Sequence, residues 1–528
     1  MKIKQFLFVF AALTLLLFSC NSFFKKPDVQ PREFWVKHFF TGEFYQITAK
    51  QLAEGKHSTI WVEEGINFSE SKAKEIAETF DNIIFPRLMA VYALRTDITF
   101  GGQTFANVLE LADWLSGGDG DGKLRILFFN RIESASYFIF TDLSKINSYH
   151  EWANYSNNSA MIYISNALFS ASYLSGVIAH EFAHMINYLN GLVLERPQIT
   201  QELWINEGLA TGAEWLYHDG HPPYRWWRQY NVSRVTGMRT FPRLIDLGNL
   251  FWNHYSENPD VEWPDYFTPY LFFSWLRLQA GTTEIWHDII TSRYSGYRAV
   301  TEAANRHMPG YGYDDWGTLF KTWLAATYIN APDGPYGYKS DTVLRNIRAA
   351  VLPPGTANLN LAPGDGFFGI AVPGFTMPAS TGNIRYVSLS LDPPALSDSE
   401  IFPGGVLLTY NLGTDIRGIT ESGISTGIPV ICSIATKFEG EWIGSIPHAQ
   451  NSHNNFTFNG NSFTFRFYEN GRVMLRRHGR FVFTETEITF IPIDTGSWQG
   501  YTQRYTLNDN ELELERDRRY PFAVVTRQ

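Results

Sequence analysis

The spacing of hydrophobic positions changes along the chain and divides it into regions of different expected structure. Between residues 69 and 94, apolar residues recur at intervals of three and four, which predicts an amphipathic helix that Pro86 kinks or divides. Runs at 124–129 and 161–165 that are apolar at all but one position predict buried strands. From about residue 365 onward, short alternating segments separated by turns replace the helical spacing. We therefore expect a multidomain α+β chain whose C-terminal region is antiparallel and all-β.

Helical spacing returns after residue 216 and then stops in a segment rich in proline and glycine. Helices are predicted over 270–279, 283–291 and 316–328, and residues 331–364 mark a domain boundary. The predicted order is a signal peptide at 1–20, a tether at 21–57, a main domain at 58–335, a β-rich domain at 365–445 and a small antiparallel β domain at 453–528.

The first twenty residues have the pattern of an export signal. Lys2 and Lys4 precede an apolar run of 13 residues, 6–18, which is short for a membrane span. The run ends in Leu-Phe-Ser-Cys and resembles a bacterial lipobox, which implies a lipid on Cys20 and attachment to the cell envelope. A plain signal peptide and a secreted protein remain the alternative.

Charge and composition exclude one class of partner. The net charge is -10, whereas binding of nucleic acid calls for a basic patch. Aromatic residues make up 16% of the chain, which argues against disorder over most of its length. The chain has 2 cysteines, so a lipid on Cys20 leaves Cys432 without an intrachain disulfide partner.

One segment carries metal-binding chemistry, the His-Glu-x-x-His motif at residues 180–184. On a helix His180 and His184 lie about 40° apart, so both imidazoles can reach one ion. Glu181 is placed to take a proton from a water at that ion. An apolar stripe covers the opposite side of the same helix and lets it pack in a core: Ile178, Phe182, Met185, Ile186 and Leu189.

Catalytic zinc needs a third protein ligand, and the sequence offers Glu207 in the segment Trp-Ile-Asn-Glu-Gly-Leu-Ala. A second helix packed antiparallel to the first can bring this carboxylate to the ion. The metzincin arrangement requires Gly and His three and six residues after His184, where Asn187 and Asn190 stand, so it is excluded.

The two motifs resemble those of the gluzincin metallopeptidases, and among them the hyicolysin-like neutral metallopeptidases. The resemblance covers about residues 58–330. It implies a thermolysin-like domain with a mixed sheet lobe, a helical lobe and a cleft between them, bordered by the strand at 161–165. It also implies a zinc ion held by His180, His184 and Glu207, with Glu181 as general base.

Two further roles follow from that resemblance and from helix geometry. An oxyanion donor should come after the third ligand, and the candidates are Tyr266, Tyr270 and His254, with Tyr270 favoured because it opens a helical run. Thr211 and Glu214 follow Glu207 by four and seven residues, on its helix face, and could orient the ligands.

These features predict an exported zinc endopeptidase that acts on proteins or peptides. Two alternatives remain open. The chain could be an adhesion or binding lipoprotein on a peptidase scaffold that has lost catalysis, or it could be an exopeptidase. Nothing in the sequence indicates the oligomeric state or a role for the C-terminal strands.

Overall fold

The computed structural model of the chain describes residues 30–38, 43–118, 120–130, 136–143, 154–166, 173–222, 267–347, 349, 351–352, 359–361, 364, 366–370, 376–402, 406–413, 425–428, 440–445, 452–459, 462–470, 472–483, 487–492, 501–508, 511–514 and 524–527. The chain divides into two compact units, one of residues 1–82 and 112–171 and one of residues 83–111 and 172–528. Within the described ranges every helix is too short or too polar to cross a bilayer. The leader that carries Cys20 lies outside these ranges.

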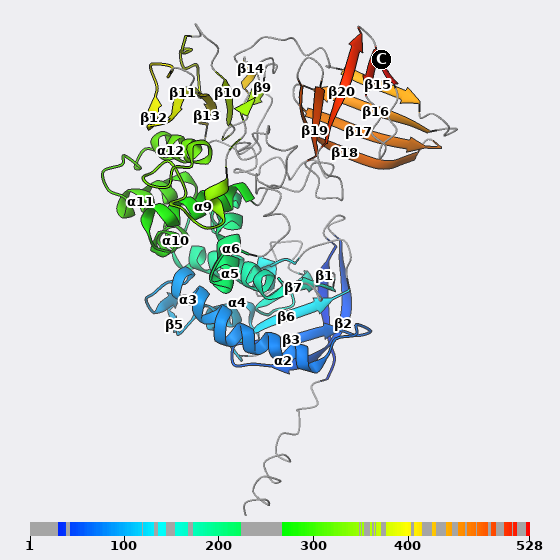
Figure 1. The fold of residues 1–528 in the computed structure, drawn as a ribbon. Helices are drawn as coiled ribbons and strands as arrows, with labels where there is room; N and C mark the ends of the chain where they lie inside the picture. The colour runs from blue at the N-terminus through cyan, green and yellow to red at the C-terminus, as the bar shows by residue number, and fades with distance from the viewer. Residues whose placement is uncertain are drawn as a thin grey trace, which may run out of the picture. The chain divides into compact units, whose positions relative to one another are not determined.

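A mixed five-stranded sheet forms the centre of the first unit (Figure 1). Its order is β1 (Arg32–Lys37), β2 (Phe44–Glu54), β3 (Ser58–Glu63), β6 (Leu124–Phe129) and β7 (Met161–Ser165). The pairs β1–β2 and β2–β3 are antiparallel, whereas β3–β6 and β6–β7 are parallel. All residues of β6 and β7 are buried, which explains why both strands are apolar apart from Arg125 in β6 and Ser165 in β7. The predicted strand at 161–165 is confirmed.

The outer side of β7 is partly covered. Tyr137 forms an antiparallel bridge with Tyr163, in which each main-chain N–H donates to the other residue's carbonyl at 3.0 Å. The two rings also stack, with centroids 4.5 Å apart. Tyr163 therefore has no open main-chain groups at the edge of the sheet, and the prediction that β7 borders a cleft stays a prediction.

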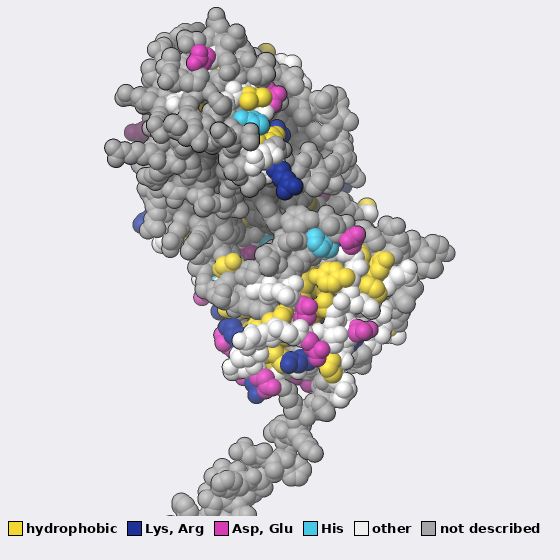
Figure 2. All heavy atoms as spheres, turned by 90° about the vertical axis from the view of Figure 1, so that its right-hand side faces the viewer, with side chains coloured by type: hydrophobic (Ala, Val, Ile, Leu, Met, Phe, Trp, Pro, Cys, Tyr) yellow, Lys and Arg dark blue, Asp and Glu magenta, His cyan; other side chains and the backbone are white. Residues whose placement is uncertain are grey.

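The predicted tether at 21–57 is wrong from Arg32 onward, because β1 and β2 lie within it. Both strands alternate, and Phe34, Val36, Ile47 and Ala49 face the core of the sheet. Their other faces are more open, and Tyr45 is 36% exposed. Figure 2 views the molecule from this side and shows hydrophobic side chains gathered among acidic ones on this unit.

The single helix predicted at 69–94 is three consecutive segments. α2 (Glu70–Thr79) is capped by the Ser69 hydroxyl, which accepts from the Lys72 N–H at 3.2 Å, and it packs along β2 and β3 (Figure 1). A π-helical turn, η1 (Phe80–Ile84), joins α2 to α3 (Phe85–Tyr92). Pro86 lies in the first turn of α3, where its missing N–H is tolerated. The chain therefore divides just before Pro86, through a π turn.

The second unit contains the helices α5 (Leu174–Val193), α6 (Leu203–His218), α9 (Phe267–Ala280), α10 (Glu284–Ile290), α11 (Tyr297–His307) and α12 (Trp316–Ile329). It also contains the small hairpin of β4 (Ile98–Phe100) and β5 (Gln103–Phe105), followed by α4 (Val108–Ser116), whose second half belongs to the first unit. The three predicted helices correspond to α9, α10 and α12. α6 packs against both α5 and α9, which places α6 in the interior.

Strands follow the helices. One sheet has the order β12 (Pro394–Ser397), β11 (Ile384–Leu391), β13 (Val406–Asn411), β10 (Gly366–Ile370) and β8 (Val351–Leu352), and a separate pair joins β14 (Ser425–Ile428) to β9 (Leu359–Leu361). The predicted α+β class is confirmed. The prediction that the strands from residue 365 onward are antiparallel is wrong for β10, which pairs in parallel with β8.

The last strands close into a barrel: β15 (Gly440–Ser445), β16 (Ser452–Asn459), β17 (Ser462–Glu469), β18 (Arg472–Phe483), β19 (Glu487–Pro492), β20 (Tyr501–Asn508), β21 (Glu511–Leu514) and β22 (Val524–Arg527). Each strand pairs with the next one in sequence, and β22 returns to β15. The barrel therefore begins at Gly440, inside the segment 365–445 that the sequence assigned to the preceding domain.

Candidate metal centre

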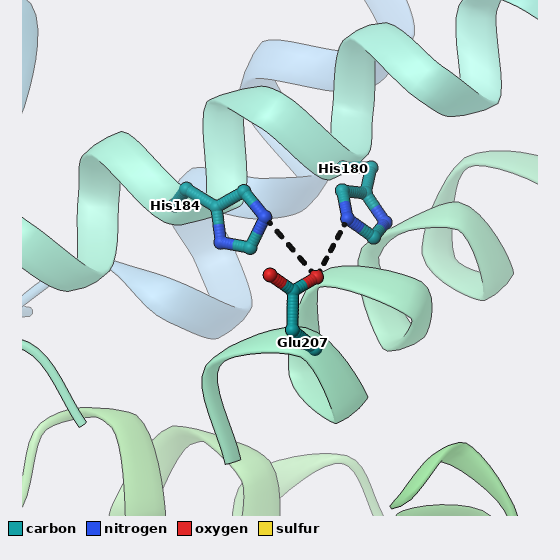
Figure 3. Close-up of side chains that lie close together, drawn as sticks. All are labelled: His180, His184 and Glu207. Atoms are coloured by element: carbon teal, nitrogen blue, oxygen red, sulfur yellow. Dashed lines mark hydrogen bonds and ion pairs between the residues drawn. The ribbon is translucent and has the colours of Figure 1, made fainter. Parts of the chain in front are cut away.

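The helix α5 carries the first part of the site. Its predicted apolar stripe is buried throughout: Ile178, Phe182, Met185, Ile186 and Leu189 are all 0% exposed. This stripe holds the helix in the core. The side chains of His180 and His184, each 12% exposed, project from another side of the helix toward α6 (Figure 3).

A side-chain bridge fixes how α6 lies against α5. The Asn187 amide donates to the Asn206 carbonyl oxygen at 2.7 Å, and Arg196 donates to the Asn187 oxygen at 3.0 Å. Asn206 directly precedes Glu207 in the chain. The bridge therefore sets the register at which Glu207 meets the two histidines, a contact that the sequence analysis did not identify.

Two glycines let neighbouring helices approach α6 closely. A Cβ on Gly208 would lie 2.5 Å from Cδ2 of Phe273 on α9, and one on Gly212 would lie 2.8 Å from the hydroxyl of Tyr92. That hydroxyl donates to the carbonyl of Leu209 at 2.7 Å. The glycines after Glu207 thus allow neighbouring side chains to pack closely against α6, which holds this helix in position.

The three predicted ligands come together (Figure 3). Oε2 of Glu207 lies 3.2 Å from Nε2 of His180 and 3.4 Å from Nε2 of His184. Donors at about 2.05 Å from a tetrahedral zinc ion stand about 3.3 Å apart, so both separations match such a site. The donor atoms of the three residues all lie within 4.8 Å of one another. Two imidazoles and one carboxylate are also a donor set typical of catalytic zinc. The residues therefore fit this ion.

The electrostatics show how strongly the three side chains interact. Burial lowers the pKa of His180, but hydrogen bonds to Glu207 and Glu214 outweigh burial, and the net pKa lies well above its usual value. Burial also lowers the pKa of His184, but the charge of Glu207, a hydrogen bond to it and the charge of Glu181 together outweigh burial, so the net pKa is raised. Burial raises the pKa of Glu207, yet the two histidines hold it at about 2. The carboxylate therefore stays ionised, as a metal ligand must.

Glu181, the predicted base, lies next to these groups on α5. The residue is 5% exposed, and burial is the main cause that raises the pKa of its carboxyl. The charges of His184 and His180 act in the opposite direction. A carboxylate whose pKa is raised by burial is a better proton acceptor than one in water.

A fourth acidic residue orients one ligand. Oε1 of Glu214 lies 2.8 Å from Nδ1 of His180, on the ring nitrogen opposite the one that faces Glu207. Such a contact fixes the tautomer and the direction of a ligating imidazole. Thr211, the other candidate, instead donates its hydroxyl to the main-chain carbonyl of Glu207 at 3.0 Å. Of the two, Glu214 acts on a ligand side chain.

Tyr270, the favoured oxyanion donor, has a different environment from the expected one. The residue is 0% exposed, and its hydroxyl lies 3.0 Å from Nδ1 of His221. Nε2 of His221 lies 3.0 Å from Asp341. Burial is the main cause that raises the pKa of Tyr270. A hydroxyl so enclosed argues against direct contact with a substrate. Tyr266 and His254, the other two candidates, lie outside the described residues.

Comparison with known proteins finds a distant relative among the metalloproteases. The chain is 24% identical over 331 residues to the neutral metalloprotease ShpI of Staphylococcus hyicus. The similar region is 58% of this chain and 66% of that protein, so just under two thirds of the relative's length is matched. No protein-family model matches the chain.

Proposed function

We propose that the chain is a zinc-dependent peptidase, and specifically an endopeptidase that hydrolyses peptide bonds of extracytoplasmic proteins. The observation that carries this proposal is the convergence of Nε2 of His180 and of His184 on one oxygen of Glu207, at separations suited to a tetrahedral ion. The similarity to a neutral metalloprotease supports it at the level of a metallopeptidase.

His180, His184 and Glu207 would hold the zinc ion. When bound, zinc lowers the pKa of a coordinated water to about 7 and polarises the scissile carbonyl. Glu214 keeps the His180 ring in place by accepting the proton of Nδ1. The hydrogen bond between Asn187 and Asn206 joins the two helices that carry the proposed ligands.

Glu181 would act as the general base. Its carboxylate accepts a proton from the attacking water and returns this proton to the leaving amine, so the peptide bond is broken with one water consumed. Burial supports this role by raising the pKa of Glu181.

The finer parts of the proposal rest on sequence features. A gluzincin relationship and a thermolysin-like domain are supported by the two motifs and by a mixed sheet that precedes the motif helix. Endopeptidase action is preferred because the chain has no recognisable motif for binding a substrate N-terminus. Export and lipid attachment through Cys20 are supported by the leader pattern.

The experiment that tests this function replaces the base and leaves the ligands intact. Glu181→Gln should bind zinc as the parent does, while kcat for cleavage of casein falls by about 10²–10⁴-fold. Glu302→Gln is the matched control, since Glu302 is an exposed residue of α11 and pairs with Arg298 there. It should cleave casein at the parent's rate.

Two results would change the assignment. Full casein cleavage by Glu181→Gln would contradict the role of this residue. A parent that binds zinc but leaves casein and short peptides intact would favour the alternative of a binding protein on a peptidase scaffold.

A further inference from the structure

The connection between α5 and α6 contains a buried cation, Arg196, which is 4% exposed. Burial lowers the pKa of Arg196 to about 10, so the guanidinium still carries its charge at neutral pH. Among the described residues its acceptors are all neutral: the carbonyls of Ile290, of Ser292 at 2.8 Å and of Ile199 at 3.2 Å, and the side-chain oxygen of Asn187 at 3.0 Å. A charge is costly to bury without an anion, so these contacts call for an explanation.

The contacts of Arg196 with main-chain carbonyls anchor the connection. Ile290 is the last residue of α10, and the carbonyls at the end of a helix attract a positive charge. The same anchoring is also achieved without a charge. Gln201, 1% exposed, donates at 3.0 Å to the carbonyls of both Ile289 and Tyr294. Anchoring alone therefore does not explain why a guanidinium is buried here.

The contact of Arg196 with Asn187 does something that a carbonyl contact cannot do. A guanidinium has only donors, whereas an amide side chain has an oxygen at one end and an NH2 group at the other. Arg196 therefore holds the oxygen of Asn187, which is 1% exposed, and directs its NH2 group away from itself. That NH2 group donates to the side-chain oxygen of Asn206 at 2.7 Å. The charge thus sets the direction of both hydrogen bonds.

This chain of side chains ends beside two of the proposed metal ligands. Asn187 follows His184 by three residues on α5, and Asn206 directly precedes Glu207 on α6. The chain therefore crosses between the two helices within one turn of each ligand. Nε2 of His184 and Oε2 of Glu207 are 3.4 Å apart, close to the separation that a tetrahedral zinc ion requires. A small shift of one helix along the other would change this separation.

We propose that Arg196 is a positioning residue of the metal centre. It acts through Asn187 and Asn206, and it sets the separation of the ligands that α5 and α6 contribute. Its own position is held by the end of α10, since Ile290 and Ser292 lie 94 and 96 residues from Arg196 in the sequence. This inference rests on the proposed zinc site, and it adds a remote segment that supports that site.

Replacement of the links of the chain tests the inference on the purified full-length protein. Arg196→Met should weaken zinc binding by about tenfold or more, as measured by competition with a chelator of known affinity. It should also shift the visible absorption bands of the protein loaded with Co²⁺, because these bands depend on the geometry of the ligands. Asn187→Leu should give the same two changes. The double variant should bind zinc no more weakly than either single one, because both changes break one chain.

Gln201→Met is the matched control, since it removes contacts between the same two connections and leaves the chain intact. It should unfold at a lower urea concentration than the parent, yet keep the parent's zinc affinity and Co²⁺ spectrum. Arg196→Lys retains a donor and should restore part of the affinity lost in Arg196→Met. If Arg196→Met does not fold, Asn206→Ala replaces it in the test, because this half-buried residue forms the other end of the chain.

The outcomes separate this inference from the proposed function. A parent that binds zinc and cleaves casein, with Arg196→Met and Asn187→Leu of equal zinc affinity to it, would overturn the role of Arg196 alone. Equal losses of affinity in Gln201→Met and Arg196→Met would overturn it as well, since anchoring would then explain the effect. A parent that binds no zinc would contradict the proposed function and, with it, this inference.

Discussion

Two buried carboxylates, Glu207 in the metal centre and Asp142 in the first unit, differ in charge because their neighbours differ. Burial raises the pKa of each. Around Glu207, His184 and His180 outweigh burial and hold the pKa at about 2. Around Asp142, which is 1% exposed, burial dominates and raises the pKa to about 7. Burial alone therefore does not decide whether a carboxylate is ionised.

The contacts of Asp142 explain its behaviour. It lies in the 3-10 helix η2 (Phe140–Leu143), accepts from the Asn157 N–H at 2.7 Å and accepts from the Tyr163 hydroxyl at 2.5 Å. Both donors are neutral, and the charge of Arg32 lowers its pKa only as the weakest cause. Asp142 thus joins the strand β7 to the loop before it, which is a structural role, whereas Glu207 keeps the charge that a cation requires.

The largest expected effect concerns stability at changing pH. Because the folded pKa of Asp142, about 7, lies above its ordinary value of 3.8, the folded state favours the protonated form. Its contribution is present below about pH 4 and is lost as the pH rises through about 7, by up to about 4 kcal/mol. Asp142→Asn should remove this loss.

Urea unfolding of the parent and of Asp142→Asn at several pH values between about 4 and 8 measures the difference. An exposed replacement, Asp97→Asn, is the control and should keep the parent's pH dependence. If Asp142→Asn and the parent lose stability in parallel, the contrast between the two carboxylates does not hold.

A smaller effect is expected where a carboxylate acts on the metal centre through a ligand. Glu214→Gln replaces the charged partner of His180 Nδ1 by a neutral one and should weaken zinc binding by about 10–100-fold. Thr211→Val is the control on the same helix, since the Thr211 hydroxyl contacts only main chain there. Competition with a chelator of known affinity measures both. Unchanged affinity in Glu214→Gln would show that this contact does not orient the ligand.

The parts of the fold that the sequence predicts well are those with strong local patterns. β6 and β7 are fully buried, so each is apolar at all but one position, Arg125 in β6 and Ser165 in β7. α11 (Tyr297–His307) was missed because its buried face consists mostly of small residues, Ala299, Ala303 and Ala304 among them. Small side chains pack well but give a weak apolar signal. β1 and β2 were missed although their alternation is visible.

The metal centre was predictable because its chemistry constrains spacing. One helical turn separates His180 from His184, and a second helix supplies Glu207, so three positions could be named from the sequence. The environment of Tyr270 could not be predicted in this way, because its contacts are distant in sequence. His221 lies 49 residues from Tyr270, and Asp341 lies 120 residues from His221. The protonation state of Asp142 could not be predicted either, because it depends on burial and on contacts with Asn157 and Tyr163 rather than on neighbouring sequence.

We propose that His180, His184 and Glu207 form one coordination site. Metal analysis of the purified chain and of Glu207→Gln, by inductively coupled plasma mass spectrometry after dialysis, tests it most directly. We expect about one zinc ion per parent chain and a large loss of zinc in the variant. A parent chain with no more zinc than Glu207→Gln would contradict it.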